Sequence, residues 1–94
     1  MNDIEYVDVI ALRALPDFNL WVRFSNGREG VRDFRPVLAR GGAMVEPLKD
    51  EAVFQALYIN DNVPAWPNGY EIDATNLHLE MLRDGLLTKP VAAE

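Results

Sequence analysis

The sequence predicts a small α+β domain: a meandering antiparallel sheet of about five strands, two short helices and a C-terminal helix. Apolar and polar residues alternate over residues 18–25, and Asn26-Gly27 follows at once, which is the strongest short hairpin signal. Strand-like segments precede and follow short helical segments, as in α+β folds. The chain has 94 residues, of which 49% are hydrophobic, so we expect one domain over residues 1–87 and a frayed tail over residues 88–94.

The strand predictions follow from alternation and turn residues. The predicted strands are residues 4–15, 18–25, 28–34, 57–59 and 63–66. We expect a turn at Pro16-Asp17, between the first and second strands, and another at Asn60-Asp61-Asn62, between the fourth and fifth, because these residue types favour turns. If Ser25 pairs with Arg28, Val22 faces Val31 and Trp21 lies opposite Arg32 in a cation–π contact, although a bulge at Gly27 would shift this register.

The helix predictions depend on capping residues. The predicted helices are a single turn at residues 35–39, a short helix at 51–55 and a longer one at 74–84. Asp50 and Asp73 are suitable N-caps for the second and third. Gly41-Gly42 ends the first helix, and Gly85 is the natural C′ residue of the last. His78, the only histidine, is expected at the partly exposed surface of the last helix.

The composition argues against an enzyme, a metal site and a bound cofactor. The chain has no cysteine, one histidine and one serine, and no glycine-rich phosphate loop. A single histidine cannot supply a zinc ligand set or an oriented catalytic dyad. We therefore expect no catalytic, metal-binding or cofactor-binding residues.

Charge and hydropathy bound the compartment and the partners. No apolar run is long enough to span a bilayer and the N-terminus is not a signal peptide, so we expect a cytoplasmic protein that does not contact a membrane. The net charge of −6 disfavours direct nucleic-acid binding. Small domains often cover an exposed sheet edge with a second copy, so self-association as a homodimer is an open alternative.

A basic window indicates where a partner would bind. Residues 22–40 contain five arginines and two acids, in a chain that is otherwise strongly acidic. The expected partner surface consists of Trp21, Arg23, Arg28, Arg32 and Arg35. Two alternatives remain open: the arginines form ordinary surface ion pairs, and Trp21 is covered by its own chain. A second expected patch is the turn formed by Trp66, Pro67, Asn68 and Gly69.

Four segments resemble a known bacterial family. They are residues 20–30, 31–38, 48–54 and 65–73, and their order is similar to that in domain of unknown function family 2442, which is similar to the N-terminal domain of a Nitrosomonas protein. The resemblance covers about residues 4–80. It implies a small α+β domain, in some members followed by a helix-turn-helix domain. It also implies a gene neighbourhood suggestive of a toxin–antitoxin or transcription-regulatory pair, and assigns no catalytic residues.

The chain departs from that family in two ways. It ends at Glu94, too early for a helix-turn-helix after the last helix, and Arg35 stands where many relatives carry a small polar cap. The leading hypothesis is therefore a non-catalytic protein-interaction or regulatory module. The alternative is a small-ligand or anion-binding sensor, with its ligand between the hairpin and the turn at residues 66–69.

Overall fold

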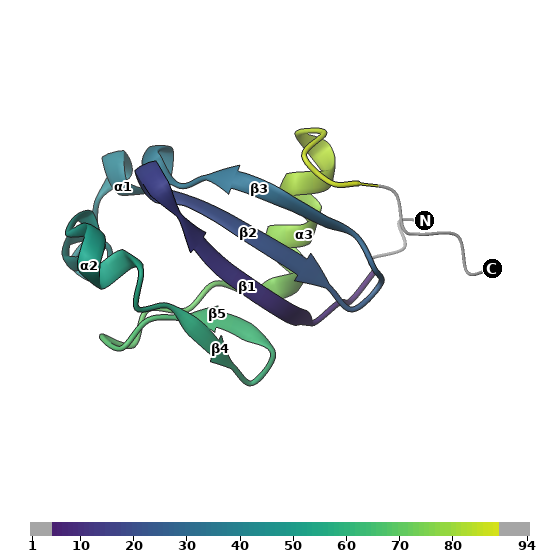
Figure 1. The fold of residues 1–94 in the computed structure, drawn as a ribbon, viewed down its shortest axis with the longest axis horizontal. Helices are drawn as coiled ribbons and strands as arrows, with labels where there is room; N and C mark the ends of the chain where they lie inside the picture. Colours follow the sequence, from purple (N-terminus) through teal and green to yellow (C-terminus); the bar gives the residue numbers. More distant parts are fainter. Residues whose placement is uncertain (1–4, 89–94) are drawn as a thin grey trace.

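The computed structural model describes residues 5–88 and confirms a small α+β fold with antiparallel sheets and three α-helices (Figure 1). The strands are β1 (Val9–Leu15), β2 (Asn19–Phe24), β3 (Glu29–Asp33), β4 (Tyr58–Asn60) and β5 (Val63–Ala65). The helices are α1 (Arg35–Arg40), α2 (Glu51–Phe54) and α3 (Ala74–Arg83), with 3₁₀ turns η1 (Pro16–Phe18) and η2 (Glu46–Lys49).

The prediction of one sheet of five strands is wrong. β1, β2 and β3 form a three-stranded antiparallel sheet, and β4 and β5 form a separate two-stranded sheet. Between β3 and β4 the chain passes through α1, η2 and α2, which cover one end of the first sheet (Figure 1). The tip of the β4–β5 hairpin contacts β1 through a single backbone hydrogen bond from Val9 N to Asn62 O (2.8 Å), which is too little to continue the ladder.

The predicted register of the β2–β3 hairpin is also wrong, by one residue. Trp21 pairs with Val31 rather than with Arg32. Gly27 has a φ of 90°, whereas Asn26 does not adopt a positive φ, so the two-residue turn with two left-handed positions does not form. The loop instead closes through Phe24 N to Arg28 O at 2.8 Å, and the extra residue shifts β3.

The β4–β5 hairpin has the tight turn that the sequence indicates. Asn60 pairs with Val63, and the two central residues, Asp61 and Asn62, have φ values of 50° and 67°. Both residue types tolerate the left-handed region better than most. The turn therefore fits the right-handed twist of its strands.

The core lies on one face of the three-stranded sheet, which we call the inner face. Near α3 it contains Val9, Val22, Phe24, Leu77 and Met81 among its buried residues. Toward α1 and α2 it contains Leu20, Phe34, Leu38, Leu48, Phe54 and Trp66. Leu12 and Ile72 pack against both clusters, so one continuous apolar layer joins the sheet to the helices.

The helix ends confirm the predicted caps. Asp50 Oδ1 accepts from Ala52 N at 2.9 Å, and Asp73 Oδ2 accepts from Asn76 N at 2.8 Å. Gly85 follows α3 with a φ of 72°, and Leu86 N donates to Met81 O at 2.9 Å, which is the expected C-terminal motif.

The residues after α3 return to the edge of β3. Thr88 N donates to Glu29 O at 2.9 Å, and Glu29 N donates to Thr88 Oγ1 at 3.2 Å. Gly30 allows this approach, because a Cβ at this position would lie only 2.1 Å from the carbonyl oxygen of Leu86. Apart from Thr88, the expected frayed tail at residues 88–94 lies outside the described residues.

Among the described residues, no helix has the length and apolar character required to cross a membrane.

Candidate functional site

The candidate site is the face of the three-stranded sheet that points away from α3, which we call the outer face. Figure 1 shows α3 behind the sheet, and no helix crosses the opposite side. Because side chains alternate along a strand, the residues between the buried ones face outward. The outer-face residues are Ala11, Arg13 and Leu15 on β1, Asn19, Trp21 and Arg23 on β2, and Glu29, Val31 and Asp33 on β3.

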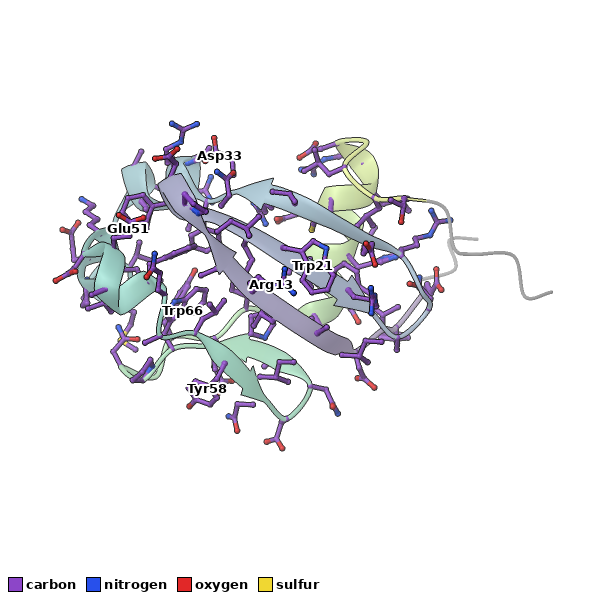
Figure 2. All side chains as sticks on the ribbon, in the orientation of Figure 1. Arg13, Trp21, Asp33, Glu51, Tyr58 and Trp66 are labelled. Carbon is purple, nitrogen blue, oxygen red and sulfur yellow. The ribbon has the colours of Figure 1, made fainter. Side chains whose placement is uncertain are left out.

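Trp21 occupies the middle of this face between two arginines. The register places Arg13 opposite Trp21 on one side and Val31 on the other. The guanidinium carbons of Arg13 and Arg23 lie 5.2 Å and 5.3 Å from the centre of the indole ring, within cation–π distance (Figure 2). Trp21 is half-buried. The expected contact of Trp21 with Arg32 is absent because of the shifted register.

The two arginines beside Trp21 differ in their ion pairs. Arg23 Nε lies 2.8 Å from Glu29 Oε1 across the β2–β3 ladder. Arg13 has no ion pair with any residue in 5–88. A guanidinium carries five N–H donors, so both side chains retain donors that can reach a partner's carboxylate.

Asp33 and Arg35 close one end of the outer face. Arg35 donates to both carboxylate oxygens, with Nη2 to Oδ2 at 2.8 Å and Nε to Oδ1 at 2.9 Å, and its backbone N–H also reaches Oδ1. These hydrogen bonds lower the pKa of Asp33 to about 2. The Asp33 carboxylate therefore binds the backbone N–H of Arg35, the first residue of α1, as well as its side chain.

The structure divides the expected partner surface among the outer face, the hairpin tip and the inner face. Trp21 and Arg23 lie together on the outer face, with Arg35 at its end. Arg28 lies at the hairpin tip, where Nη1 donates to Thr88 O at 3.3 Å. Arg32 lies on the inner face, where its Nη1 is 2.7 Å from Glu80 Oε1 of α3.

Sequence reasoning missed Arg13, the residue that completes the arrangement around Trp21. Arg13 lies outside the basic window and reaches Trp21 only through the β1–β2 register. The one available signal was strand alternation, which places Arg13 on the opposite face from Leu12 and Ala14. Nothing in the sequence indicated which residue it would pair with.

The second expected patch retains only its turn. Trp66, labelled in Figure 2, is fully buried, and its Nε1 donates to Phe54 O at 2.9 Å. Its ring packs against those of Phe34, Phe54 and Tyr70. Its large apolar ring fills the core beside α2, and its only hydrogen-bond donor, the indole N–H, is satisfied by the carbonyl oxygen of Phe54. Trp66 is therefore not a surface residue.

The remaining residues of that patch form a surface turn. Pro67, Asn68 and Gly69 are exposed, and Asn68 Nδ2 donates to Met44 O at 2.9 Å. The hydrogen bond fixes this turn to the segment between α1 and η2.

A pocket of about 170 Å³ opens on the inner side, between β3, α1 and α3. It is lined by Arg32, Phe34, Val37, Arg40, Tyr70, Ile72, Asn76 and Glu80. The expected ligand position lay between the hairpin and the turn at residues 66–69. The pocket includes Arg32 of the hairpin and Tyr70, the residue after that turn, but no residue of the turn itself.

His78 is buried, at 2% exposure, and not at the helix surface as the sequence predicted. Its Nε2 lies 3.0 Å from Asn26 Nδ2, and its ring packs edge-to-face on Phe24 with centroids 5.0 Å apart. Burial lowers the pKa of His78. The residue links α3 to the β2–β3 turn, so its role in the described residues is structural.

The outer face gathers residue types that are common in protein interfaces. The described residues contain no group of three or more histidine or carboxylate side chains placed to hold a metal ion. The outer face instead presents an indole, two stacked guanidinium groups and the exposed Val31, which is 42% exposed. Tryptophan and arginine are the residue types enriched at the centres of protein interfaces.

The chain is a small α+β domain in which no described helix covers the outer face of the three-stranded sheet. A family model described as "Protein of unknown function (DUF2442)" matches residues 9–81, from the start of β1 into α3, and the chain belongs to this family. This match confirms the resemblance that the ordered sequence segments indicated. No curated protein and no solved structure matches the chain.

Proposed function

We propose that this protein is a non-catalytic interaction module that binds an acidic segment of a protein partner on the outer face of its three-stranded sheet. The observation that carries the proposal is Trp21, held between Arg13 and Arg23 on a face that no other described element covers. A rigid aromatic flanked by charged donors is the usual form of an interface anchor.

The charges on this face support an acidic partner. The chain carries a net charge of −6, yet Arg13, Arg23 and Arg35 outnumber Glu29 and Asp33 on and beside the outer face. Arginine forks bind carboxylates in two-pronged geometry and are less strongly hydrated than lysine, so they lose less on burial. A segment with carboxylates beside apolar side chains would match both the guanidinium groups and the Trp21–Val31 pair.

The test is quantitative affinity capture from a lysate of the source organism with three forms of the tagged protein. These are the wild type, Arg13→Glu as the disrupting variant, and Arg83→Glu as the control. Arg83 is an exposed arginine at the end of α3, and its only ion pair among the described residues is with the adjacent Asp84. Both variants replace exposed side chains, so each should melt within a few degrees of the wild type.

We expect one protein at stoichiometric yield with the wild type and with Arg83→Glu, and its loss with Arg13→Glu. A purified complex should also weaken steeply with salt, because the contacts are charged. Equal recovery by all three forms, or no stoichiometric partner, would overturn the proposal. So would a homodimer in sedimentation that Arg13→Glu dissociates, since the occupant of the face would then be a second copy.

A further inference from the structure

We propose that the pocket between β3, α1 and α3 binds a small monocarboxylate with an apolar body. The site is separate from the outer face, because Leu20 and Arg32 pair on the inner side of the sheet while Trp21 points the other way. The two proposals therefore stand or fall independently.

Two arginines supply the pocket with positive charge. Arg32, on β3, lines the pocket with a side chain that is only 18% exposed, and Arg40, the last residue of α1, also lines it. Arg40 makes no ion pair with any residue in 5–88. Its guanidinium is thus available to an anion that enters the pocket.

Glu80 reduces the charge of the pocket and fixes Arg32. Its Oε1 is 2.7 Å from Arg32 Nη1, and its Oε2 accepts from Asn76 Nδ2 at 3.1 Å. Both carboxylate oxygens therefore have partners. Arg32 uses one nitrogen in this pair and keeps further N–H donors for a ligand.

The charge count favours a monoanion. Two guanidinium groups and one carboxylate leave a single net positive charge, which one ligand carboxylate would neutralise. A phosphate dianion would exceed that charge and approach Glu80, and like charges at close range are costly in a partly buried site.

The other walls and the size define the body of the ligand. Phe34, Val37 and Ile72 are apolar, and Tyr70 adds an aromatic ring. The volume of about 170 Å³ is well below that of pockets for drug-sized ligands, about 300–1,000 Å³. A short branched aliphatic or single-ring acid would fill this space while its carboxylate meets Arg40 and Arg32.

The test is a chemical-shift titration of ¹⁵N-labelled protein with sodium isobutyrate and sodium benzoate. Sodium phosphate and sodium chloride at equal ionic strength serve as comparison salts. The variants are Arg40→Gln, which removes the guanidinium that has no ion pair, and Arg83→Gln, which removes an exposed arginine outside the pocket. The same spectra report whether each variant is folded.

We expect saturable shifts at the amides of Arg40, Tyr70, Ile72 and Asn76 with at least one of the two carboxylates. Arg40→Gln should weaken this binding at least tenfold, and Arg83→Gln should leave it unchanged. Shifts that rise linearly with both carboxylates, or that match the chloride series, would overturn the proposal. So would equal binding by the two variants, or tighter binding of phosphate than of either carboxylate.

Discussion

Replacement of Trp66 by phenylalanine should destabilise this domain far more than the same replacement at Trp21. Trp66 is fully buried, and its indole N–H donates to the carbonyl oxygen of Phe54 at 2.9 Å. Phenylalanine cannot donate, so the buried carbonyl loses its partner. Trp21 is half-buried, and the guanidinium groups of Arg13 and Arg23 lie over its ring on a face that no described helix covers.

The magnitude follows from these two environments. A buried polar group left without a partner costs about 1–3 kcal/mol. The space left by the smaller ring adds about 1 kcal/mol, since complete removal of a buried aromatic side chain costs roughly 3–5 kcal/mol. We therefore expect Trp66→Phe to lose about 2–4 kcal/mol of the free energy of unfolding. Trp21→Phe should lose less than about 1 kcal/mol, because exposed cation–π contacts are weak.

Urea denaturation followed by far-UV circular dichroism measures both losses in one assay. A thermal melt followed by the same signal should show a fall in Tm of roughly 10–30 °C for Trp66→Phe, because each kcal/mol lost lowers Tm by about 4–8 °C in a domain of this size. Each variant keeps one tryptophan, so fluorescence separately reports burial of Trp66 in Trp21→Phe. A loss below about 1 kcal/mol for Trp66→Phe, or equal losses for the two variants, would refute this reasoning.

Three further predictions follow from close contacts and titratable groups. Gly30→Ala should displace the segment that contains Leu86, because the added Cβ would overlap the carbonyl oxygen of Leu86, and should lower the free energy of unfolding by about 1–3 kcal/mol. It should also speed hydrogen exchange at the amide of Thr88, which donates to Glu29 O, and an unchanged exchange rate would contradict the prediction. Because burial lowers the pKa of His78 in the folded state, the unfolded chain binds the extra proton, so stability should fall as pH drops below the unfolded value of 6.5. His78→Gln should flatten this slope in urea titrations from pH 7.5 to 5, and an equal slope would argue against a neutral buried ring. In an NMR titration Asp33 should show a pKa of about 2, and Arg35→Gln should return it toward the ordinary 3.8; no change would rule out the arginine as the cause.

Local sequence signals predicted most elements well, because each depends on residues close in the chain. The caps Asp50 and Asp73 are confirmed since a side-chain oxygen needs only the amides of the next helical turn. The turn at Asp61 and Asn62 is confirmed for a similar reason. The β2–β3 register was predicted wrongly because Asn26-Gly27 is compatible with loops of more than one length. The additional loop residue shifts the pairing by one position, so the strand partner of Arg32 is Leu20 instead of Trp21.

The candidate site was predicted only in part. Trp21 lies on the face opposite the core, which agrees with the alternation of apolar and polar residues over residues 18–25. Trp66 was placed at the surface because Pro67-Asn68-Gly69 indicated a turn, but its ring packs into the core before that turn begins. His78 was expected at a helix surface, yet the β2–β3 turn covers it through Asn26.

The α+β class, the helix caps, the hairpin positions and the family can all be predicted from the sequence alone. Hydrogen bonds between near neighbours and the alternation of side chains control these features, and both are visible along the chain. Three features are apparent only in the folded domain: the strands divide into two sheets, Arg13 rather than Arg32 lies over Trp21, and Arg32 and Arg40 line one pocket. These outcomes depend on register and on packing between distant segments, where a shift of one residue sends a side chain to a different partner.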